Sequence, residues 1–322
     1  MCKDHIYQHI VPRCYLKYFS PDKKKIWVKK RNESTSFDNI NEVGGENYFY
    51  DINTPKTGRK TEIEENVLGT SIETPYGVDL KHIYEEGKTF LQTSNKNIIF
   101  EGDKKYRFAT CIVVQYIRLP KFKHYFELLA QDFEKSPLKY LAKEHLEKIT
   151  EPEDINTYPY VSASLLHANL GFHNYDIIEK YAKFLSDNYW EFLITSSNKV
   201  CTSNNPIQIA NINSKIDAIP YSVNDIAKFV ALLNKFEEWV PLPFDDLINF
   251  DTFIGFPINR NVYLKIWNKN KFLQKKETDC IFVPISDVEL KSLNLMTYHN
   301  CTELYSHLSF NEIFDNEIKE YG

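Results

Sequence analysis

The chain has 322 residues, of which 43% are hydrophobic and 26% are charged, and its formal net charge is −5. This length supports one large domain or two moderate ones with a sizeable core, and the acidic balance argues against a uniformly basic nucleic-acid-binding surface. No stretch reaches the roughly 20 apolar residues of a membrane-spanning helix, so we expect no membrane partner.

The first part of the chain reads as a basic hairpin. A turn at Lys23–Lys25 precedes a short apolar strand at Ile26–Val28, and Lys29–Arg31 follows it. A second strand is predicted at Asn47–Tyr50, after a turn made by two glycines. Because Trp27 lies within this basic segment, the hairpin could contact nucleic acid. The alternative is a solvated hairpin without a ligand.

Two helices are predicted next. The first begins near Thr61, where glutamates lie close to the positive helix N-terminus. We expect it to end before Pro75, because the residue that precedes a proline disfavours the α conformation. The second is short, covers Asp79–Glu86 and is closed by Gly87.

The clearest helix is Lys104–Leu119, which Pro120 terminates. Its apolar residues recur every four positions, which predicts one buried stripe: Phe108, Ile112 and Tyr116. A different face carries polar or reactive groups at spacings of four and three, which should point in a common direction: Cys111, Gln115 and Arg118.

The rest of the chain changes from helical to β-rich. Further helices are predicted at Phe122–Glu134, Leu138–Ile149 and Tyr175–Tyr189. Strands follow at Glu191–Thr195, Lys199–Thr202, Ile207–Ile209, Asn261–Trp267 and Ile281–Pro284, and a helix capped by Ser286 covers Asp287–Asn294. We predict an α+β fold with a short N-terminal hairpin, a largely helical middle and a β-rich later segment. The predicted division is one two-lobed domain with segments 1–103, 104–190 and 191–322.

The cysteines and the first residues bear on the compartment. The six cysteines form no CxxC pair and no zinc-ligand spacing, which indicates reduced, mostly buried thiols. The first residues lack the apolar run of a signal peptide. We therefore expect a cytoplasmic protein.

Four ordered motifs resemble one bacterial family. They are the opening segment His9–Phe19, then Gln115–Pro120, then Trp190–Leu193 with the turn Thr202–Pro206, and weaker markers at Phe256–Pro257 and Ser292–Asn294. Together they resemble domain of unknown function 4238 over nearly the whole chain. The family name implies no established reaction. The resemblance implies an aspartate where this chain has Asn204, so a carboxylate that binds a metal or accepts a proton would be missing here.

The opening histidines also invite comparison with HNH nucleases. Asp4–Ile6 and His9–Pro12 each resemble the first strand of such a site, where a histidine activates water beside a metal. The asparagine that this site needs is too distant at Asn32. The alternative is that His9 is a structural histidine at the edge of the core.

Gln115, Arg118 and two glutamates form a second candidate group. A polar pair on a buried helix face needs a partner, and a guanidinium can bind a phosphate or carboxylate. The alternative is an internal salt bridge from Arg118 to Glu65 or Glu73. These glutamates point within about 80° of each other on a helix. They could share a metal with His9, or they could form a solvated face.

The turn Thr202–Pro206 supplies the last candidates. Ser and Asn side chains bond to nearby backbone amides, which favours a structural turn. Polar turns after strands also present groups to ligands, so Ser203 and Asn204 remain candidate binding residues.

These residues lead to a hypothesis of a metal-dependent nuclease or phosphodiesterase from a bacterial defence or toxin system. His9 would act as the general base, and Arg13 and Arg118 would hold the phosphate. Glu65 or Glu73 would bind a divalent cation, Mg²⁺ or Mn²⁺. The substrate would be a nucleic acid or a nucleotide.

Two other classes stay open. Ser203 and Asn204 would orient the substrate in a nuclease, but an amide cannot replace a carboxylate as a base, and this favours a non-catalytic sensor. Such a sensor would bind a nucleotide or a partner protein of a defence operon. In a purely structural protein, the polar motifs would only hold the lobes together, and replacing Arg118 would sharply lower stability.

Overall fold

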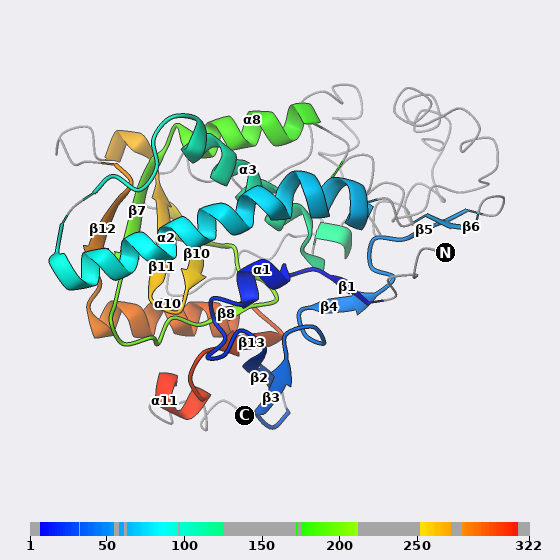
Figure 1. The fold of residues 1–322 in the computed structure, drawn as a ribbon, viewed down its shortest axis with the longest axis horizontal. Helices are drawn as coiled ribbons and strands as arrows, with labels where there is room; N and C mark the ends of the chain where they lie inside the picture. The colour runs from blue at the N-terminus through cyan, green and yellow to red at the C-terminus, as the bar shows by residue number, and fades with distance from the viewer. Residues whose placement is uncertain are drawn as a thin grey trace.

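The structure is a computed structural model that describes residues 7–31, 33–54, 58–60, 63–95, 97–120, 122–124, 172, 175–211, 252–271 and 279–314. Helices and several β-sheets build this part of the chain, which confirms the α+β class (Figure 1). The expected helix Leu138–Ile149 and all but the first three residues of Phe122–Glu134 lie outside the described residues.

A five-stranded sheet forms the centre of the fold. Its strand order is β12-β7-β11-β10-β9, and the pair β12–β7 is parallel while the other pairs are antiparallel. Every residue of β10 and β11 is buried, so these strands carry the core. The strands are β7 (Tyr189–Ile194), β9 (Gln208–Asn211), β10 (Thr252–Asn259), β11 (Val262–Trp267) and β12 (Ile281–Pro284).

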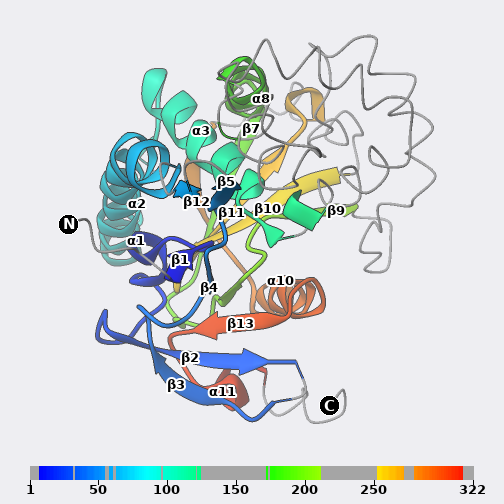
Figure 2. The ribbon, with the colours of Figure 1, turned by 90° about the vertical axis from the view of Figure 1, so that its right-hand side faces the viewer.

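A second sheet joins early and late parts of the chain (Figure 2). Its antiparallel order is β3-β2-β13-β8, so the first predicted segment and the last share one sheet. The strands are β2 (Lys25–Lys30), β3 (Ser36–Asn39), β8 (Thr202–Ser203) and β13 (Glu303–Ser306).

Two short strand pairs lie beside these sheets. Strand β1 (Tyr7–His9) pairs with β4 (Gly45–Asn47), and β5 (Ile52–Thr54) pairs with β6 (Gly58–Lys60). The strand expected at Asn47–Tyr50 was therefore wrong in position. Tyr48 has φ +60°, in the left-handed region, and this ends the strand.

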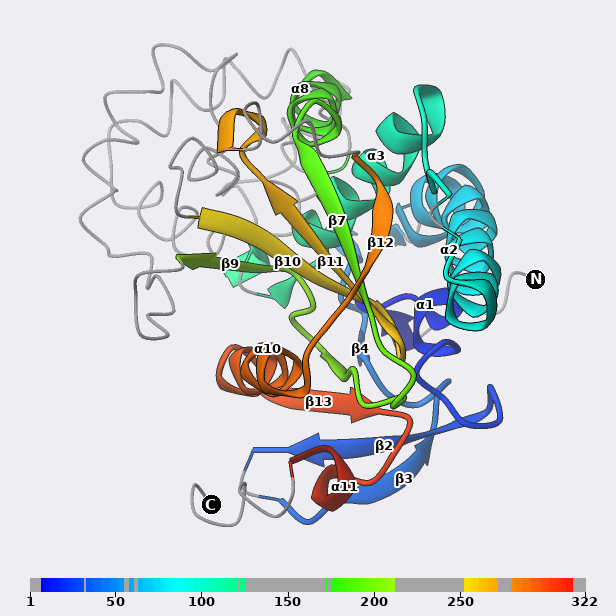
Figure 3. The ribbon, with the colours of Figure 1, turned by 90° about the vertical axis from the view of Figure 1, so that its left-hand side faces the viewer.

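Helices α2 and α3 lie together on one side of the five-stranded sheet (Figure 3). Ring contacts tie them to it: Phe90 of α2 lies 5.5 Å from Phe282, and Phe108 of α3 lies 6.1 Å from Trp190. The helices are α1 (Arg13–Leu16), the π-helix η1 (Ile63–Glu73), α2 (Thr74–Thr93), α3 (Asp103–Ile117), α8 (Tyr175–Ser186), the 3₁₀ turn η6 (Lys269–Lys271), α10 (Asp287–His299) and α11 (Phe310–Phe314).

The boundary expected before Pro75 is confirmed, because η1 ends at Glu73 and α2 begins at Thr74, but the boundary expected at Gly87 was wrong. Pro75 lies in the first turn of α2, where a missing N–H leaves no hydrogen bond unmade. Gly87 lies inside α2, and a Cβ there would be 3.3 Å from the Cδ1 atom of Ile194. The glycine lets the helix approach the sheet closely instead of ending it.

Two expected features of the helices are confirmed. The stripe on α3 is buried, with Phe108 and Ile112 both fully inside the core. Ser286 caps α10, because its side chain accepts a hydrogen bond from the Glu289 N–H at 3.2 Å. Among the described residues, none of the helices has the length and apolar character needed to span a membrane.

Candidate functional site

Two glycines fix the backbone of the opening segment. In the β1–β4 pair, His9 lies opposite Gly45, and the Val11 N–H donates to the Gly44 carbonyl at 2.8 Å. Gly44 has φ +70°, and a Cβ there would lie 3.2 Å from that of Val11. Because only glycine accepts both this conformation and this approach without strain, the pair sets the position of His9.

His9 is a half-buried, neutral imidazole with one ring nitrogen already bonded. Its Nε2 atom lies 3.3 Å from the Ile40 carbonyl oxygen, which can only accept, so Nε2 carries the proton and Nδ1 keeps its lone pair. Burial and then the charge of Arg13 lower the pKa of His9 to about 4. At neutral pH, the ring can therefore accept a proton at Nδ1.

Arg13 supplies an exposed positive charge beside this ring. It begins α1, is exposed, and its Nη1 atom donates to Asn41 Oδ1 at 3.2 Å. Asn41 follows Ile40 directly, so one connection after β3 holds both His9 and Arg13. An exposed guanidinium next to a neutral imidazole is an arrangement that can bind an anion.

Arg118 is buried and bonded inside the chain. It is 1% exposed, its Nε donates to the Tyr50 hydroxyl at 3.1 Å, and its Nη2 donates to the His9 carbonyl at 2.7 Å. The same Nη2 forms a salt bridge with Glu73 at 2.7 Å. Burial alone would lower the pKa of Arg118, but Tyr50 and Glu73 outweigh it and raise that pKa. The internal salt bridge weighed from the sequence is thus present, with Glu73 as the partner.

Gln115 reaches the same stretch of backbone. It is 2% exposed, and its Nε2 donates to the Ile10 carbonyl at 3.2 Å. Among the described residues, its Oε1 atom is buried without a hydrogen-bond partner. Gln115 and Arg118 therefore bind consecutive carbonyls of the opening segment, which confirms that the two side chains point in a common direction.

The predicted metal ligands are only partly described. Glu73 has a side chain that is 27% exposed, and one of its oxygens is bonded to Arg118. The side chain of Glu65 lies outside the described residues. In the part of the chain that the structure describes, no group of three or more His, Cys, Asp and Glu side chains could hold a metal ion. A shared metal with His9 stays a prediction.

Ser203 and Asn204 belong to the turn after β8. Ser203 is fully buried, and its hydroxyl accepts a hydrogen bond from the Asn205 N–H at 3.2 Å. The Asn204 carboxamide oxygen accepts the N–H groups of Thr302 and Glu303, each at 3.2 Å, and its Nδ2 donates to the Thr302 hydroxyl at 2.6 Å. These bonds extend the pairing of β8 with β13, as a structural turn would.

The structure places the sequence-predicted residues in two groups. The first surrounds the opening segment and contains His9, Arg13, Glu73, Gln115 and Arg118. The second, Ser203 and Asn204, lies on the β8–β13 pair. A buried tyrosine connects the two: the Tyr15 hydroxyl donates to the Pro257 carbonyl and lies 2.6 Å from Thr202 Oγ1.

Comparison with known proteins gives the family. The sequence profile of the family described as Protein of unknown function (DUF4238) matches residues 7–309. The chain belongs to the DUF4238 family. No curated protein and no solved structure matches this chain significantly. The DUF4238 match begins at the first residue of β1 and ends just before α11, so it contains every candidate residue named above.

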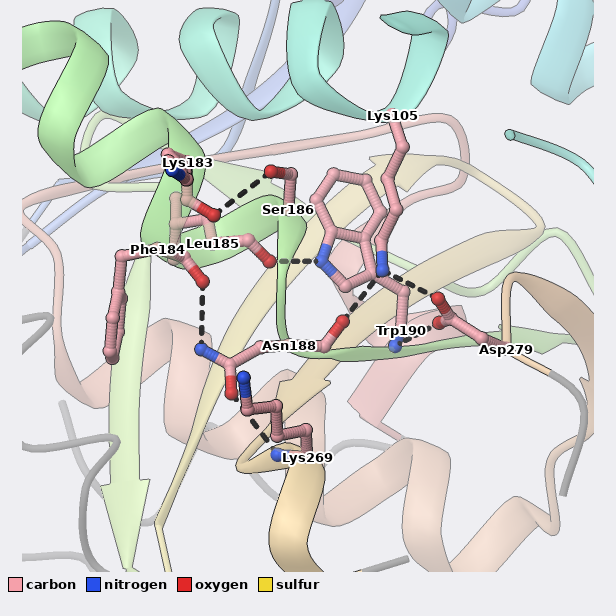
Figure 4. A network of polar contacts seen from close by, with 9 residues as sticks. All are labelled: Lys105, Lys183, Phe184, Leu185, Ser186, Asn188, Trp190, Lys269 and Asp279. Carbon is pink, nitrogen blue, oxygen red and sulfur yellow. Dashed lines mark hydrogen bonds and ion pairs between the residues drawn. The ribbon is translucent and has the colours of Figure 1, made fainter. Parts of the chain in front are cut away.

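A tryptophan anchors the helices of this DUF4238 chain to the central sheet (Figure 4). Trp190 donates from its ring to the Leu185 carbonyl at 2.8 Å and from its backbone to Asp279 at 2.7 Å. The Lys105 ammonium lies 5.3 Å from the centre of the Trp190 ring and donates to the Asn188 carbonyl at 2.6 Å and to Asp279 at 2.5 Å. The tryptophan motif is therefore a packing element that joins α3, α8 and the segment before β12.

Sequence reasoning missed three partners of the DUF4238 candidate site. Tyr50, Ile40 and Asn41 all contact it through hydrogen bonds. Ile40 acts through its backbone carbonyl, a group that every residue has, so no sequence signal could have identified it. Tyr50 lies in the aromatic run that was expected to be a strand, and its aromatic character was the one available signal.

Proposed function

We propose that this DUF4238 protein is a phosphodiesterase, in its simplest form a nuclease, in which His9 takes the proton from the attacking water. One observation carries this proposal. The neutral His9 ring is oriented through Nε2 by the Ile40 carbonyl, which leaves Nδ1 as a proton acceptor beside the exposed guanidinium of Arg13.

The low pKa of His9 fits an anionic substrate. A base with a pKa of about 4 is weak, and the nearby charge of Arg13 is one cause of that value. A phosphate diester bound to Arg13 would offset this charge and favour the protonated imidazole. Substrate binding would therefore strengthen the base at the step in which it is needed.

The buried residues around His9 act in this proposal as positioning groups. Arg118 and Gln115 hold the carbonyls of His9 and Ile10, and neither guanidinium nor amide is turned to solvent. The phosphate-binding role expected for Arg118 passes to Arg13, which is exposed. Glu73 lies beside Arg118 with a side chain that is 27% exposed. A divalent cation could therefore reach its carboxylate.

Hydrolysis of labelled single-stranded and duplex DNA and RNA, with EDTA, Mg²⁺ or Mn²⁺, tests the proposal. His9→Gln is the informative variant, because the glutamine amide can still donate to the Ile40 carbonyl but cannot act as a base. We expect a loss of at least about 100-fold in kcat, the usual contribution of a general base. His82→Gln is the matched control, since His82 Nε2 also lies 3.0 Å from a backbone carbonyl, that of Ile99.

The outcomes separate the roles. Arg13→Gln should raise KM more than it lowers kcat if Arg13 binds the phosphate. Undiminished hydrolysis by His9→Gln would remove His9 from the chemistry. If the protein acts in a defence or toxin system, we expect the wild-type protein to arrest growth when it is expressed in bacteria. His9→Gln should not arrest growth.

A non-catalytic sensor is the second candidate, and one observation favours it. The polar groups of Arg118 and Asn204 are bonded inside the chain, so neither is presented to a substrate. In this case a folded wild-type protein hydrolyses none of the four substrates. Calorimetric titration would then detect binding of a nucleotide or of a partner protein of a defence operon.

A further inference from the structure

The β2–β3 hairpin presents an aromatic pair between two lysines. Strand β2 places Lys25, Trp27 and Lys29 on one face, because side chains alternate along a strand. Phe37 of β3 lies directly opposite Trp27 in the register and shares this face. The order along the hairpin is therefore lysine, two aromatic rings, lysine.

The two rings are held in place, and one of them is open to solvent. Their centroids are 5.0 Å apart, and Phe37 is 38% exposed. Trp27 is half-buried and packs against an apolar cluster that includes Phe310 and Phe314 of α11. Trp27 thus packs against one side of Phe37, and part of the Phe37 ring remains open to solvent.

Two lysine ammonium groups lie beside this aromatic pair. The Lys25 ammonium lies 5.8 Å from the centre of the Phe37 ring. The Lys29 ammonium donates to the Glu33 carbonyl at 2.6 Å, an uncharged acceptor that leaves its charge in place. The nearby carboxylate of Asp22 keeps its negative charge and accepts the backbone N–H groups of Lys24 and Lys25 at 2.8 and 2.7 Å. This cationic surface contrasts with a net charge of −5 for the chain.

The hairpin continues into the His9 site. The Ile40 N–H donates to the Lys24 carbonyl at 2.9 Å, and the Ile40 carbonyl is the one that faces His9. The next residue, Asn41, binds Arg13. The basic turn that precedes β2 and the exposed guanidinium of Arg13 are therefore bonded to two consecutive residues, Ile40 and Asn41.

We propose that the hairpin face made by Lys25, Trp27, Lys29 and Phe37 binds single-stranded nucleic acid. A base stacks on the exposed face of Phe37, and Lys25 and Lys29 bind the phosphates on either side. Stacking requires an unpaired base, which excludes an intact duplex. An acidic peptide would satisfy the lysines but would not use the exposed ring. This binding needs no catalysis, so it stands independently of the proposed hydrolysis.

Fluorescence anisotropy with labelled oligothymidylate and oligouridylate tests the surface on the full chain. The measurements are made with EDTA in the His9→Gln background, so that the probe stays intact. Phe37→Ala should weaken binding about tenfold, as expected for loss of one stacked base. In the double variant Lys25→Glu and Lys29→Glu, the slope of log affinity against log salt concentration should become less steep by about 1.4, because two phosphate contacts are lost.

Matched controls come from α8, far from the hairpin in Figure 1. Tyr175→Ala removes another exposed ring, 61% exposed, and Lys183→Glu reverses another exposed charge. Both should bind like the parent protein. Thermal unfolding checks that Phe37→Ala is folded.

Three results would overturn the inference: no binding of either probe at low salt, equal affinity of the hairpin variants and the α8 controls, or competition by polyglutamate as strong as by oligothymidylate. Hydrolysis that is lost in His9→Gln, together with equal affinity of the hairpin variants and the α8 controls, would support the proposed function and refute this surface. Weaker binding by the hairpin variants without any hydrolysis would support this surface and refute the proposed function.

Discussion

Replacing Arg118 by methionine tests whether the best-connected buried charge is a structural clamp. Methionine keeps most of the volume and removes the guanidinium. The change deletes the salt bridge to Glu73 at 2.7 Å and the bonds to the His9 carbonyl at 2.7 Å and to the Tyr50 hydroxyl at 3.1 Å. We expect the folded state to lose stability because these partners keep their polarity.

The magnitude follows from what each partner can do afterwards. Removing one member of a buried ion pair costs about 3–5 kcal/mol. The Glu73 side chain is 27% exposed and can regain water, and the His9 carbonyl still receives the Tyr50 hydroxyl at 3.2 Å. Both facts place the expected loss at the lower end, about 3 kcal/mol.

Urea unfolding of wild type, Arg118→Met and Glu73→Gln measures this loss, with an unchanged slope as evidence of an unchanged denatured state. The double variant should be little worse than Arg118→Met, because the carboxylate has already lost its partner. Lys17→Met controls for an exposed cation. A loss below about 1 kcal/mol, or a gain in stability, would refute the clamp and indicate a strained arginine kept for a ligand.

Three further predictions concern stability. The pKa of His9 is 6.5 in a free peptide and about 4 here. Between these values the unfolded chain binds a proton that the folded protein does not, so the free energy of unfolding should fall by up to roughly 3 kcal/mol as the pH drops from 6.5 to 4. Urea unfolding at several pH values should show this fall for the wild type and not for His9→Gln. Lys105→Met should cost about 1–2 kcal/mol in the same assay, less than Arg118→Met, because the Asp279 side chain is 42% exposed. Asn204→Ala should lower the free energy of unfolding by about 1–3 kcal/mol, because the N–H groups of Thr302 and Glu303 lose their acceptor. Asn204→Asp keeps an acceptor and should lower it by less than about 1 kcal/mol in thermal and urea unfolding.

Much of the local structure could be predicted because its causes are local. The period of four on α3 identified its buried stripe, and the spacing of Gln115 and Arg118 correctly gave them one direction. The cap at Ser286 follows from a side chain that bonds an N–H three residues later. Such contacts lie within one helical turn, where sequence distance and spatial distance agree.

Other features depend on partners far along the chain. Gly87 was expected to end a helix, but it lies inside α2. There the absence of a side chain lets the helix pack closely against Ile194 of the central sheet. The pairing of β2 with β13 joins residues that are more than 270 positions apart, and neither strand carries a signal that selects the other.

The candidate site shows the same division. The sequence singled out His9 and Arg118 as polar residues in unusual surroundings, and the structure brings them together. The sequence could not show which group of His9 Arg118 contacts. Arg118 binds the backbone carbonyl of His9, while the imidazole contacts the Ile40 carbonyl. This contact assigns Arg118 to the support of the site and leaves the exposed Arg13 as the group that can meet a substrate.

Asn204 shows how one turn can separate the enzyme hypothesis from the sensor hypothesis. Its carboxamide oxygen already accepts two N–H groups, from Thr302 and Glu303, which a carboxylate oxygen accepts equally well. The second carboxylate oxygen can accept the Thr302 hydroxyl, which is now the acceptor of Nδ2 and is free to rotate. An aspartate and an asparagine therefore serve the turn alike, and the residue difference needs no loss of catalysis to explain it. If Asn204→Asp creates metal binding or raises hydrolysis, the carboxylate has a chemical role instead, and the β8–β13 turn must then be counted as part of the active site.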